Sequence, residues 1–151
     1  ELGLPILSRD IQKGLKNAFW PGRMEKVSDE PLIVLDGAHN DHAMKVMVNN
    51  LKTEFKGQHI HAIFGALSTK DINAMVKDLN TVSNLDLKVT AFDYPKAFTK
   101  EEYEVMGLEA YGDWRDALAD TLTELTGDDL ILITGSLYFI SQVRETLLGG
   151  N

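Results

Sequence analysis

Four short apolar runs recur along the chain, and amphipathic stretches separate them. The runs are PLIVLD (31–36), HIHAIFG (59–65), LKVTAFD (87–93) and DLILITG (129–135). Their apolar residues stand mostly at consecutive positions, which is typical of strands that are buried on both faces. Buried strands that alternate with amphipathic helices predict an α/β domain, in which helices cover both faces of a parallel sheet.

Segments with the 3.6-residue periodicity of a helix lie between and after these runs. They span residues 43–51, 71–79, 114–125 and 136–147. In three of them we expect one apolar stripe to be buried: Met44, Met47, Val48 and Leu51; Ile72, Met75, Val76 and Leu79; and Leu137, Ile140, Val143 and Leu147. Each of these helices therefore has a face that can pack against the sheet.

Three further elements complete the predicted domain. ILSRDIQKGLKNAF (6–19) is predicted to be a helix, and a short strand is predicted near Leu108–Tyr111. In GRMEKV (22–27), polar and apolar residues alternate, and the short turn SDEP separates this segment from the run at 31–36. This pattern predicts an antiparallel strand that forms a hairpin with the parallel set. At 151 residues, the whole chain (1–151) is predicted to be a single domain.

The charge and hydropathy of the chain narrow the possible partners. There are 15 Lys and Arg residues against 23 Asp and Glu, a net charge of −8, and the basic residues are scattered. A surface that holds a nucleic-acid backbone needs clustered positive charge, so no nucleic-acid partner is expected. No apolar run approaches the ~18 residues that span a bilayer, so no membrane partner is expected either.

The chain contains no cysteine. This excludes disulfides, thiolate nucleophiles and Cys-ligated zinc, and it is compatible with a cytoplasmic location. The sequence begins at Glu1 rather than at a methionine, so we expect it to be a piece of a longer protein.

Polar and glycine-rich residues follow the four predicted strands, at the junctions DGAHN, GALSTKD, DYPKAF and GSLY. In open parallel sheets, ligands bind beyond the carboxyl ends of the strands, where a strand passes into a helix. Because the fold brings these ends to one edge of the sheet, we expect several of the junctions to form a common ligand site there.

The segment LDGAHNDHAM (35–44) has three interpretations. In the first it is a polar turn, in which Gly37 bends the chain and Asn40 or the following Asp caps the next helix. In the second it binds phosphate, because a ligand can approach the backbone at Gly37 and the helix N-terminus attracts anions. Asp36 would then accept a hydrogen bond from a ribose hydroxyl, and His39 would donate one to a phosphate oxygen.

The third interpretation of this segment is a metal site. His39 and His42 stand three residues apart, and Asp36 and Asp41 could add oxygen ligands. No second cluster with metal-ligand spacing follows, and the two histidines of HIHAIFG are interpreted as a pair on one face of the sheet. We therefore expect no metal-ligating residue in this chain.

Three other junction residues have both a structural and a functional interpretation. Arg23 in WPGR is either a solvated turn residue or a planar donor to a nucleotide phosphate. Lys70 in GALSTKD runs against the preference for acidic residues at a helix N-terminus, which suggests an anionic ligand such as a carboxylate. Ser136 in GSLY is either an N-cap or a residue that binds a ligand carboxylate.

Neither GxxxxGK[ST] nor GxSxG occurs in the chain, so a P-loop ATPase and a serine hydrolase are not expected.

The segments WPGRME, LDGAHN, GALSTKD and ITGSLYFISQVR occur in this order. Together they resemble the C-terminal domain of folylpolyglutamate synthase, including the bifunctional dihydrofolate synthase/folylpolyglutamate synthase, a domain that is shared with the muramyl ligases in the Mur ligase superfamily. The resemblance extends from about Leu4 to Leu148. It implies a Rossmann-like three-layer fold with a six-stranded, mostly parallel sheet, one antiparallel strand and helices on both faces.

The resemblance also implies an activity. The full enzyme activates a folate or dihydropteroate carboxylate with ATP and Mg²⁺, forming an acyl phosphate that the amino group of L-glutamate attacks. The P-loop and the magnesium ligands are expected in a covalently preceding ATPase domain. The isolated chain is therefore expected to be inactive.

Single residues take roles from the resemblance. Nucleotide contacts are expected from Arg23, Asp36, His39 and Asn40. Glutamate contacts are expected from Lys70, Ser136 and Tyr138 (or Phe139). His39 and Lys70 are expected to be the catalytic residues.

The chain departs from the family pattern at two positions. Asp41 stands where proline is usual, and aspartate suits the first turn of a helix equally well, so little functional change is expected. Thr69 stands where an acid is more common, so an acidic role is not expected there. The alternative function is a stand-alone Rossmann-like module that binds a nucleotide or another anion without catalysis.

Overall fold

The computed structural model describes residues 23–149, which form six strands and five helices. The strands are β1 (Glu25–Asp29), β2 (Leu32–Asp36), β3 (Ile60–Phe64), β4 (Leu85–Thr90), β5 (Ala110–Tyr111) and β6 (Leu130–Thr134). The helices are α2 (Asp41–Glu54), α3 (Ile72–Leu79), α4 (Lys100–Val105), α5 (Trp114–Glu124) and α6 (Leu137–Leu147). The helix predicted at 6–19 lies outside the described residues.

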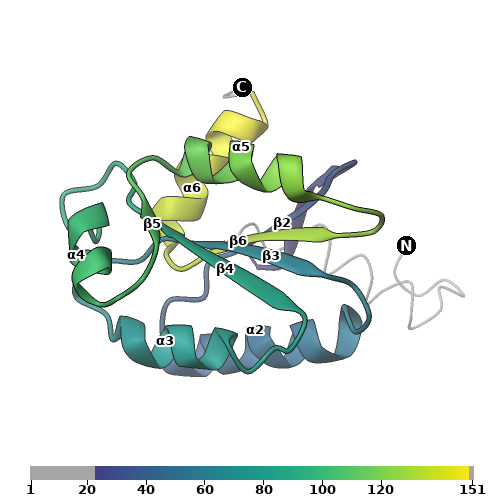
Figure 1. Cartoon of the computed structure of the whole chain (residues 1–151), viewed down its shortest axis with the longest axis horizontal. Helices are drawn as coiled ribbons and strands as arrows, with labels where there is room; N and C mark the ends of the chain where they lie inside the picture. The colour runs from purple at the N-terminus through teal and green to yellow at the C-terminus, as the bar shows by residue number, and fades with distance from the viewer. Residues whose placement is uncertain (1–22, 150–151) are drawn as a thin grey trace, which may run out of the picture.

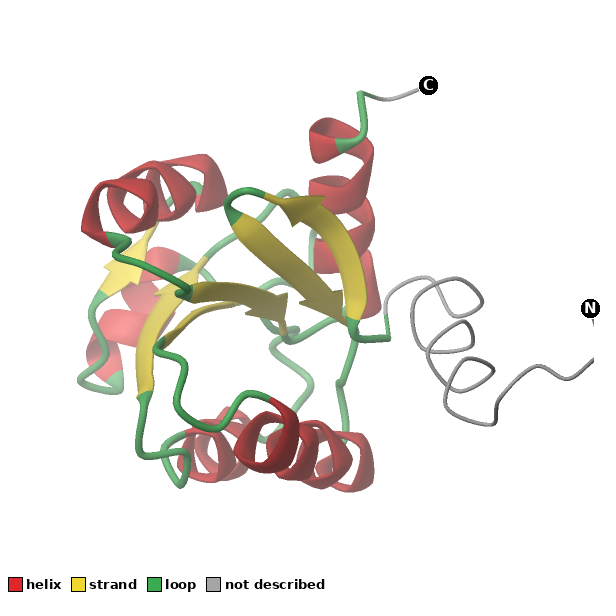
Figure 2. Cartoon of the chain, turned by 90° about the vertical axis from the view of Figure 1, so that its right-hand side faces the viewer, coloured by secondary structure: helices red, strands yellow, loops and turns green. Residues whose placement is uncertain are grey.

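The strands form one sheet in the order β1-β2-β6-β3-β4-β5. β1 pairs antiparallel with β2, and the other neighbours pair in parallel. Helices α2 and α3 cover one face of the sheet and α5 and α6 cover the other (Figure 1). Turned by 90°, the strands are seen between these two layers (Figure 2). The predicted three-layer α/β fold is confirmed, including its antiparallel strand.

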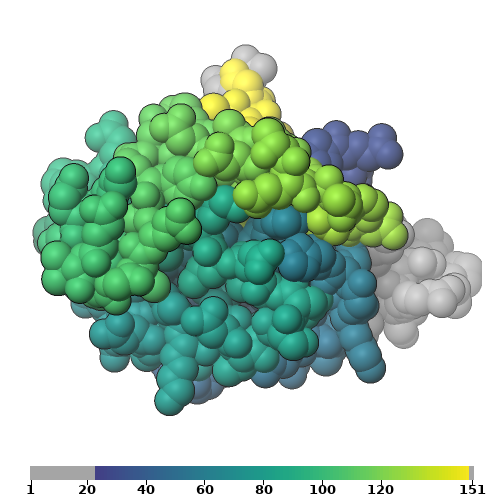
Figure 3. Space-filling view, in the orientation of Figure 1, coloured from purple at the N-terminus to yellow at the C-terminus, as the bar shows by residue number. Residues whose placement is uncertain are grey.

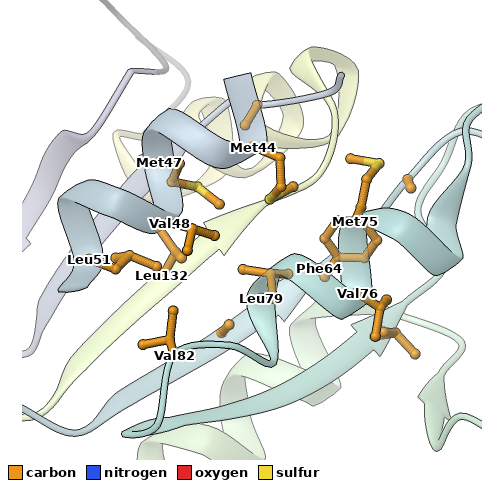
Figure 4. Close-up of a cluster of buried hydrophobic side chains, with 14 of the residues drawn as sticks. Met44, Met47, Val48, Leu51, Phe64, Met75, Val76, Leu79, Val82 and Leu132 are labelled. Carbon is orange, nitrogen blue, oxygen red and sulfur yellow. The ribbon is translucent and has the colours of Figure 1, made fainter. Parts of the chain in front are cut away.

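Successive strand residues point to opposite faces, so each strand contributes to two separate cores. Val34, Ala62, Phe64 and Leu132 pack with α2 and α3. On the other face, the strand residues that pack with α5 and α6 are Ile33, Leu35, Ile63, Ile131 and Ile133. The stripes that were predicted for α2 and α3 are buried, as Figure 4 shows for the first of the two cores.

The stripe that was predicted for α6 is wrong at its first position. Leu137 is 52% exposed, whereas Phe139, Ile140 and Val143 are buried. The 3.6-residue pattern is satisfied by either choice, and the aromatic ring of Phe139 takes the core position, where it packs against Phe92 with 5.0 Å between ring centroids. Leu137 is thereby left at the surface, where it lines the cleft described below.

Two segments differ from the prediction in their bounds, and one helix was not predicted. The hairpin strand is β1 at Glu25–Asp29 instead of 22–27, because Arg23 and Met24 form a bend. The strand predicted at 87–93 ends at Thr90. Helix α4 was not predicted, because its six residues bury only Tyr103 and carry no apolar stripe.

In the part of the chain that the structure describes, no helix has the length and apolarity to span a membrane.

Candidate functional site

A cleft of about 770 Å³ opens at the carboxyl end of β2 and the start of α2. The described residues that line it are Arg23, Asp36, Gly37, Ala38, His39, Asn40, Asp41, His42, Ala43, Val46, Met47, Asn50 and Leu137. β2, β6 and β3 are neighbours in the sheet and end side by side at this edge. The expectation of a site at the carboxyl ends of the strands thus matches the position of the cleft.

Asp36 is the last residue of β2 and is buried, with 6% of its surface exposed. One carboxylate oxygen accepts the backbone N–H of Ala38 at 2.9 Å, and the other accepts that of Met24 at 3.1 Å. Burial raises the pKa of this carboxyl above its usual value, while the two amides and the charge of Arg23 act in the opposite direction. Asp36 therefore joins the bend at Arg23 and Met24 to the turn after β2, and this holds two cleft segments together.

His39 is held by its own turn. Its Nδ1 lies 2.9 Å from the carbonyl oxygen of Gly37, which can only accept, so Nδ1 carries a hydrogen in this arrangement. The neutral ring then offers Nε2 as an acceptor, and the protonated ring offers it as a donor. A hydrogen bond from Nε2 to a phosphate oxygen thus requires the imidazolium form of His39.

Asn40 is the N-cap of α2, where its side-chain oxygen accepts the backbone N–H of Ala43 at 2.8 Å. The capping interpretation of Asn40 is confirmed. Asp41 is the first helical residue and lies 3.4 Å from Nζ of Lys45, so its charge is partly offset within the helix. The positive end of the helix dipole and its free amides are thus directed at the cleft.

A smaller pocket of about 200 Å³ adjoins the cleft. It is lined by His39, Asn40, Asp41, Lys70, Asp71, Ala74 and Met75. Lys70 therefore lies in the same pocket as two residues of the DGAHN turn, although they are thirty residues apart in the sequence. Asp71, rather than Ser68 or Thr69, caps α3 by accepting the N–H of Ala74 at 3.1 Å.

Ser136 and Tyr138 line neither of these two pockets. Ser136 is buried, with 2% of its surface exposed, and its hydroxyl oxygen accepts the N–H of Tyr138 at 3.1 Å. The N-cap interpretation of Ser136 is confirmed. Tyr138 is 52% exposed and stacks on Tyr94, with 4.3 Å between ring centroids and 21° between the rings. Of the seven candidate contact residues, five thus lie together: Arg23, Asp36, His39 and Asn40 line the cleft, and Lys70 lines the adjoining pocket.

The cleft also has an apolar wall that the sequence analysis did not identify. Val46, Met47 and Leu137 line it, and Val46 and Leu137 are 49% and 52% exposed. Exposed aliphatic side chains beside convergent polar groups are typical of sites for small organic ligands. Val46 could have been recognised because it lies outside the predicted buried stripe of α2, whereas Leu137 was missed because it was predicted to be buried.

Close packing explains two of the three glycines at the strand ends, Gly65 and Gly135. A Cβ atom at Gly37 would lie 2.4 Å from Cδ2 of Leu137, but this is the end of an exposed side chain that can move aside. Gly135 has a φ of +122°, and a Cβ atom there would lie 2.4 Å from the carbonyl oxygen of Gly65. Gly65 in turn donates its N–H to the carbonyl oxygen of Thr134 at 3.0 Å. These glycines let α6 and the junctions after β3 and β6 approach one another at the cleft edge.

Among residues 23–149, no group of three metal-ligating side chains forms at the cleft. The cleft instead combines a cationic side chain, a helix N-terminus, an apolar wall and a buried carboxylate. Together with the sheet topology, these features define a Rossmann-like α/β domain with a cleft at the carboxyl edge of its strands, and the cation and the helix N-terminus make this cleft suitable for an anion.

The chain belongs to the family of the Mur ligase glutamate ligase domain, whose model matches residues 22–137. It is 41% identical over 147 residues to a folylpolyglutamate synthase of Lacticaseibacillus casei, a match that covers 97% of this chain and 34% of that protein. It therefore spans about a third of the length of this curated relative.

Solved structures of bifunctional folylpolyglutamate synthase/dihydrofolate synthase have the same fold. The enzyme of Yersinia pestis in complex with AMPPNP and a Mn ion matches with a TM-score of 0.75 and 28% identity, over 97% of this chain and 36% of that one. A structure of the same kind of enzyme with Mn, AMPPNP and L-glutamate bound matches with a TM-score of 0.76 and 27% identity, with the same coverage.

Proposed function

We propose that this chain is the C-terminal domain of an ATP-dependent ligase that adds L-glutamate to folate or dihydropteroate. The observation that carries the proposal is the cleft itself, since Arg23, Asp36, His39 and Asn40 line it and Lys70 lies in the adjoining pocket. Relatives named folylpolyglutamate synthase match almost the whole chain, and a matching structure binds AMPPNP and L-glutamate.

The larger cleft is assigned to the nucleotide. The guanidinium of Arg23 pairs with a phosphate oxygen, and the N-terminus of α2 adds its dipole and its free amides. The ring of His39, when protonated, donates from Nε2 to the same phosphate chain. Asp36 has both oxygens occupied by backbone amides, and the remaining lone pairs of these oxygens can accept a ribose hydroxyl.

The smaller pocket is assigned to the incoming glutamate. Lys70 stands one residue before the N-cap of α3, so its charge and the helix N-terminus act together on a carboxylate. Ser136 contributes by fixing the start of α6, and its hydroxyl hydrogen remains able to donate to a carboxylate. Tyr138 lines neither pocket, and it is proposed as a glutamate contact because its exposed ring is fixed by stacking on Tyr94.

The proposed reaction needs no nucleophile from this chain. ATP converts the folate carboxylate to an acyl phosphate, the glutamate amino group attacks its carbonyl carbon, and an amide, ADP and phosphate result. His39 and Lys70 are the proposed catalytic residues, because both line the glutamate pocket and His39 also lines the nucleotide cleft, so they can stabilise the negative charge that develops there.

Further parts of the ligase are proposed to lie outside this chain. A covalently preceding ATPase domain would supply the P-loop and the ligands of Mg²⁺, because the chain has no GxxxxGK[ST] motif and residues 23–149 place no group of three metal-ligating side chains at the cleft. A cytoplasmic location is proposed as well, since the chain has no cysteine to form disulfides.

The proposal is tested by measuring ADP release with the 151-residue chain and with the same chain joined to its upstream region. We expect the joined protein to hydrolyse ATP only when both folate or dihydropteroate and L-glutamate are present, and the isolated chain to release no ADP. ATP turnover by the isolated chain would contradict the proposal that the upstream domain supplies the P-loop and the Mg²⁺ ligands. A joined protein that binds nucleotide and never forms the glutamyl amide would favour a binding module instead.

A further inference from the structure

A second group of titratable side chains lies at the amino ends of the parallel strands, the edge of the sheet opposite to the cleft. His59 and His61 stand at the start of β3, Asp86 stands at the start of β4, and Glu124 and Asp129 flank the connection from α5 to β6. Together with Thr126, they line a shallow, open surface cavity of about 540 Å³. The segment that begins β3 and the segment after α5 lie next to one another in the space-filling view (Figure 3). The five residues of β3 separate this cavity from the cleft by about 17 Å.

The two histidines form a compact pair with two carboxylates. Nε2 of His59 lies 2.7 Å from a carboxylate oxygen of Asp86, and Nε2 of His61 lies 2.9 Å from one of Asp129. The two rings meet edge to face, with 4.6 Å between their centroids. His59, His61 and Asp86 each offer one ligand atom, and the three atoms lie within 4.8 Å of one another.

His61 has a buried nitrogen without a partner. Only 5% of its side chain is exposed, and its Nδ1 makes no hydrogen bond. The nearest candidate acceptor is Oε1 of Glu124 at 3.9 Å, which is too far for a hydrogen bond. Because Nε2 is engaged by Asp129, Nδ1 is the nitrogen whose lone pair is left over. Buried polar atoms are rarely left unpaired in folded proteins, so the unpaired Nδ1 of His61 indicates that a ligand binds there.

The charges around the cavity match a divalent cation. Lys88 places its Nζ 2.7 Å from Oε1 of Glu124, so these two side chains neutralise each other. Asp86 and Asp129 remain, and their two carboxylates give the cavity an acidic character. Imidazole and carboxylate are the ligands that zinc and similar first-row ions prefer.

We propose that His59, His61 and Asp86 bind a divalent ion of the zinc class, with Asp129 as the residue that orients His61. A carboxylate that holds the second ring nitrogen of a ligating histidine is a general feature of zinc sites. Two nitrogens and one oxygen leave a fourth position for water. At a tetrahedral centre, ligand atoms stand about 3.3 Å apart. The side chains of Asp86 and His59 are 69% and 42% exposed, so both can rotate to reach that spacing.

The test is calorimetric titration of ZnCl₂ into the untagged, metal-free 151-residue chain. We expect a single ion per chain, and at least a tenfold lower affinity in Asp86→Asn and in His59→Gln. Both side chains are partly exposed, so these variants should keep the fold, which circular dichroism and the melting temperature check. His42→Gln is the matched control, because it removes an exposed histidine at the other edge of the sheet and should leave zinc binding unchanged.

Nitrogen-15 spectra of the histidine rings provide a second measurement. In the metal-free chain we expect His61 to carry its hydrogen on Nε2, and zinc should shift Nδ1 of His61 while Nε2 stays protonated. Zinc affinity that is unchanged in both Asp86→Asn and His59→Gln would overturn the proposal. A loss of binding in His42→Gln alone would overturn it too, because it would move the site to the DGAHN turn. Since the proposed ligase activity uses the opposite edge, neither result bears on it.

Discussion

Gly135 joins β6 to α6, and its replacement by alanine tests whether the junctions at the cleft edge depend on close backbone contact. Two costs arise at this position. A φ of +122° is unfavourable for any residue with a Cβ atom, and that atom would lie 2.4 Å from the carbonyl oxygen and 2.9 Å from the nitrogen of Gly65. The neighbour is backbone that is itself bonded to Thr134, so it cannot swing aside as a flexible side chain would.

Gly57 provides a matched control with only the first of these costs. Its φ is +91°, and a Cβ atom there would meet nothing within 4 Å. A left-handed backbone conformation costs an alanine about 1–2 kcal/mol. Forcing an atom into packed surroundings adds about 1–3 kcal/mol. We therefore expect Gly57→Ala to lose about 1.5 kcal/mol and Gly135→Ala about 3.5 kcal/mol of the free energy of unfolding.

Both variants can be compared by urea unfolding and by calorimetry. For a domain of this size, 1 kcal/mol corresponds to about 2–4 °C in the melting temperature, so Gly135→Ala should melt about 10 °C below the parent and Gly57→Ala about 4–5 °C below it. If Gly135→Ala were as stable as Gly57→Ala, the close contact between Gly135 and Gly65 would not constrain the cleft edge, and the packing explanation of these glycines would be refuted.

Three further predictions concern single hydrogen bonds. Tyr103→Phe leaves the buried N–H of Ala66 without its acceptor, which now lies at 3.1 Å, and should cost about 1–3 kcal/mol in urea unfolding; an unchanged midpoint would contradict this contact. Ser136→Ala removes the N-cap of α6 and should lower the free energy of unfolding by about 1 kcal/mol. Circular dichroism should show the loss of helix beginning at a lower temperature than in the parent, and an unchanged free energy of unfolding would mean that the cap contributes nothing. Burial and the hydrogen bond to Asp120 raise the pKa of Tyr111 to about 12, so its contribution to stability is complete below pH 10 and is lost as the pH rises through 12; in Asp120→Asn, carbon-13 spectra should show this tyrosine ionising at lower pH, and an unchanged titration would contradict the assignment.

The elements that could be predicted from the sequence are those whose pattern has a single solution. In α2 and α3, aliphatic and methionine side chains occupy one stripe and polar residues occupy the rest, so the buried face follows directly. In α6, Leu137 and Phe139 both adjoin the stripe, and only the space left between α6 and Phe92 decides which one is buried. Helix α4 has no stripe, and it is fixed by a capping box between Thr99 and Glu102 and by the burial of Tyr103.

The site was predictable to the extent that it follows from sheet topology. Residues at the carboxyl ends of parallel strands must lie along one edge, which is why Asp36 and His39 both line the cleft there. The pocket shared by His39 and Lys70 depends on how α2 and α3 pack, which no local pattern encodes. The contact between His61 and Asp129, 68 residues apart, depends on the pairing of β3 with β6 and was missed for the same reason.

The cleft is proposed to hold the nucleotide, and the adjoining pocket is proposed to hold glutamate. The most direct test is the Michaelis constants of the ligase that contains this chain, measured separately for ATP and L-glutamate in Arg23→Ala and Lys70→Ala. We predict that Arg23→Ala raises the KM for ATP at least tenfold with little change for glutamate, and that Lys70→Ala raises mainly the KM for glutamate. Wild-type constants for ATP in Arg23→Ala, or equal effects of both variants on both substrates, would contradict this assignment.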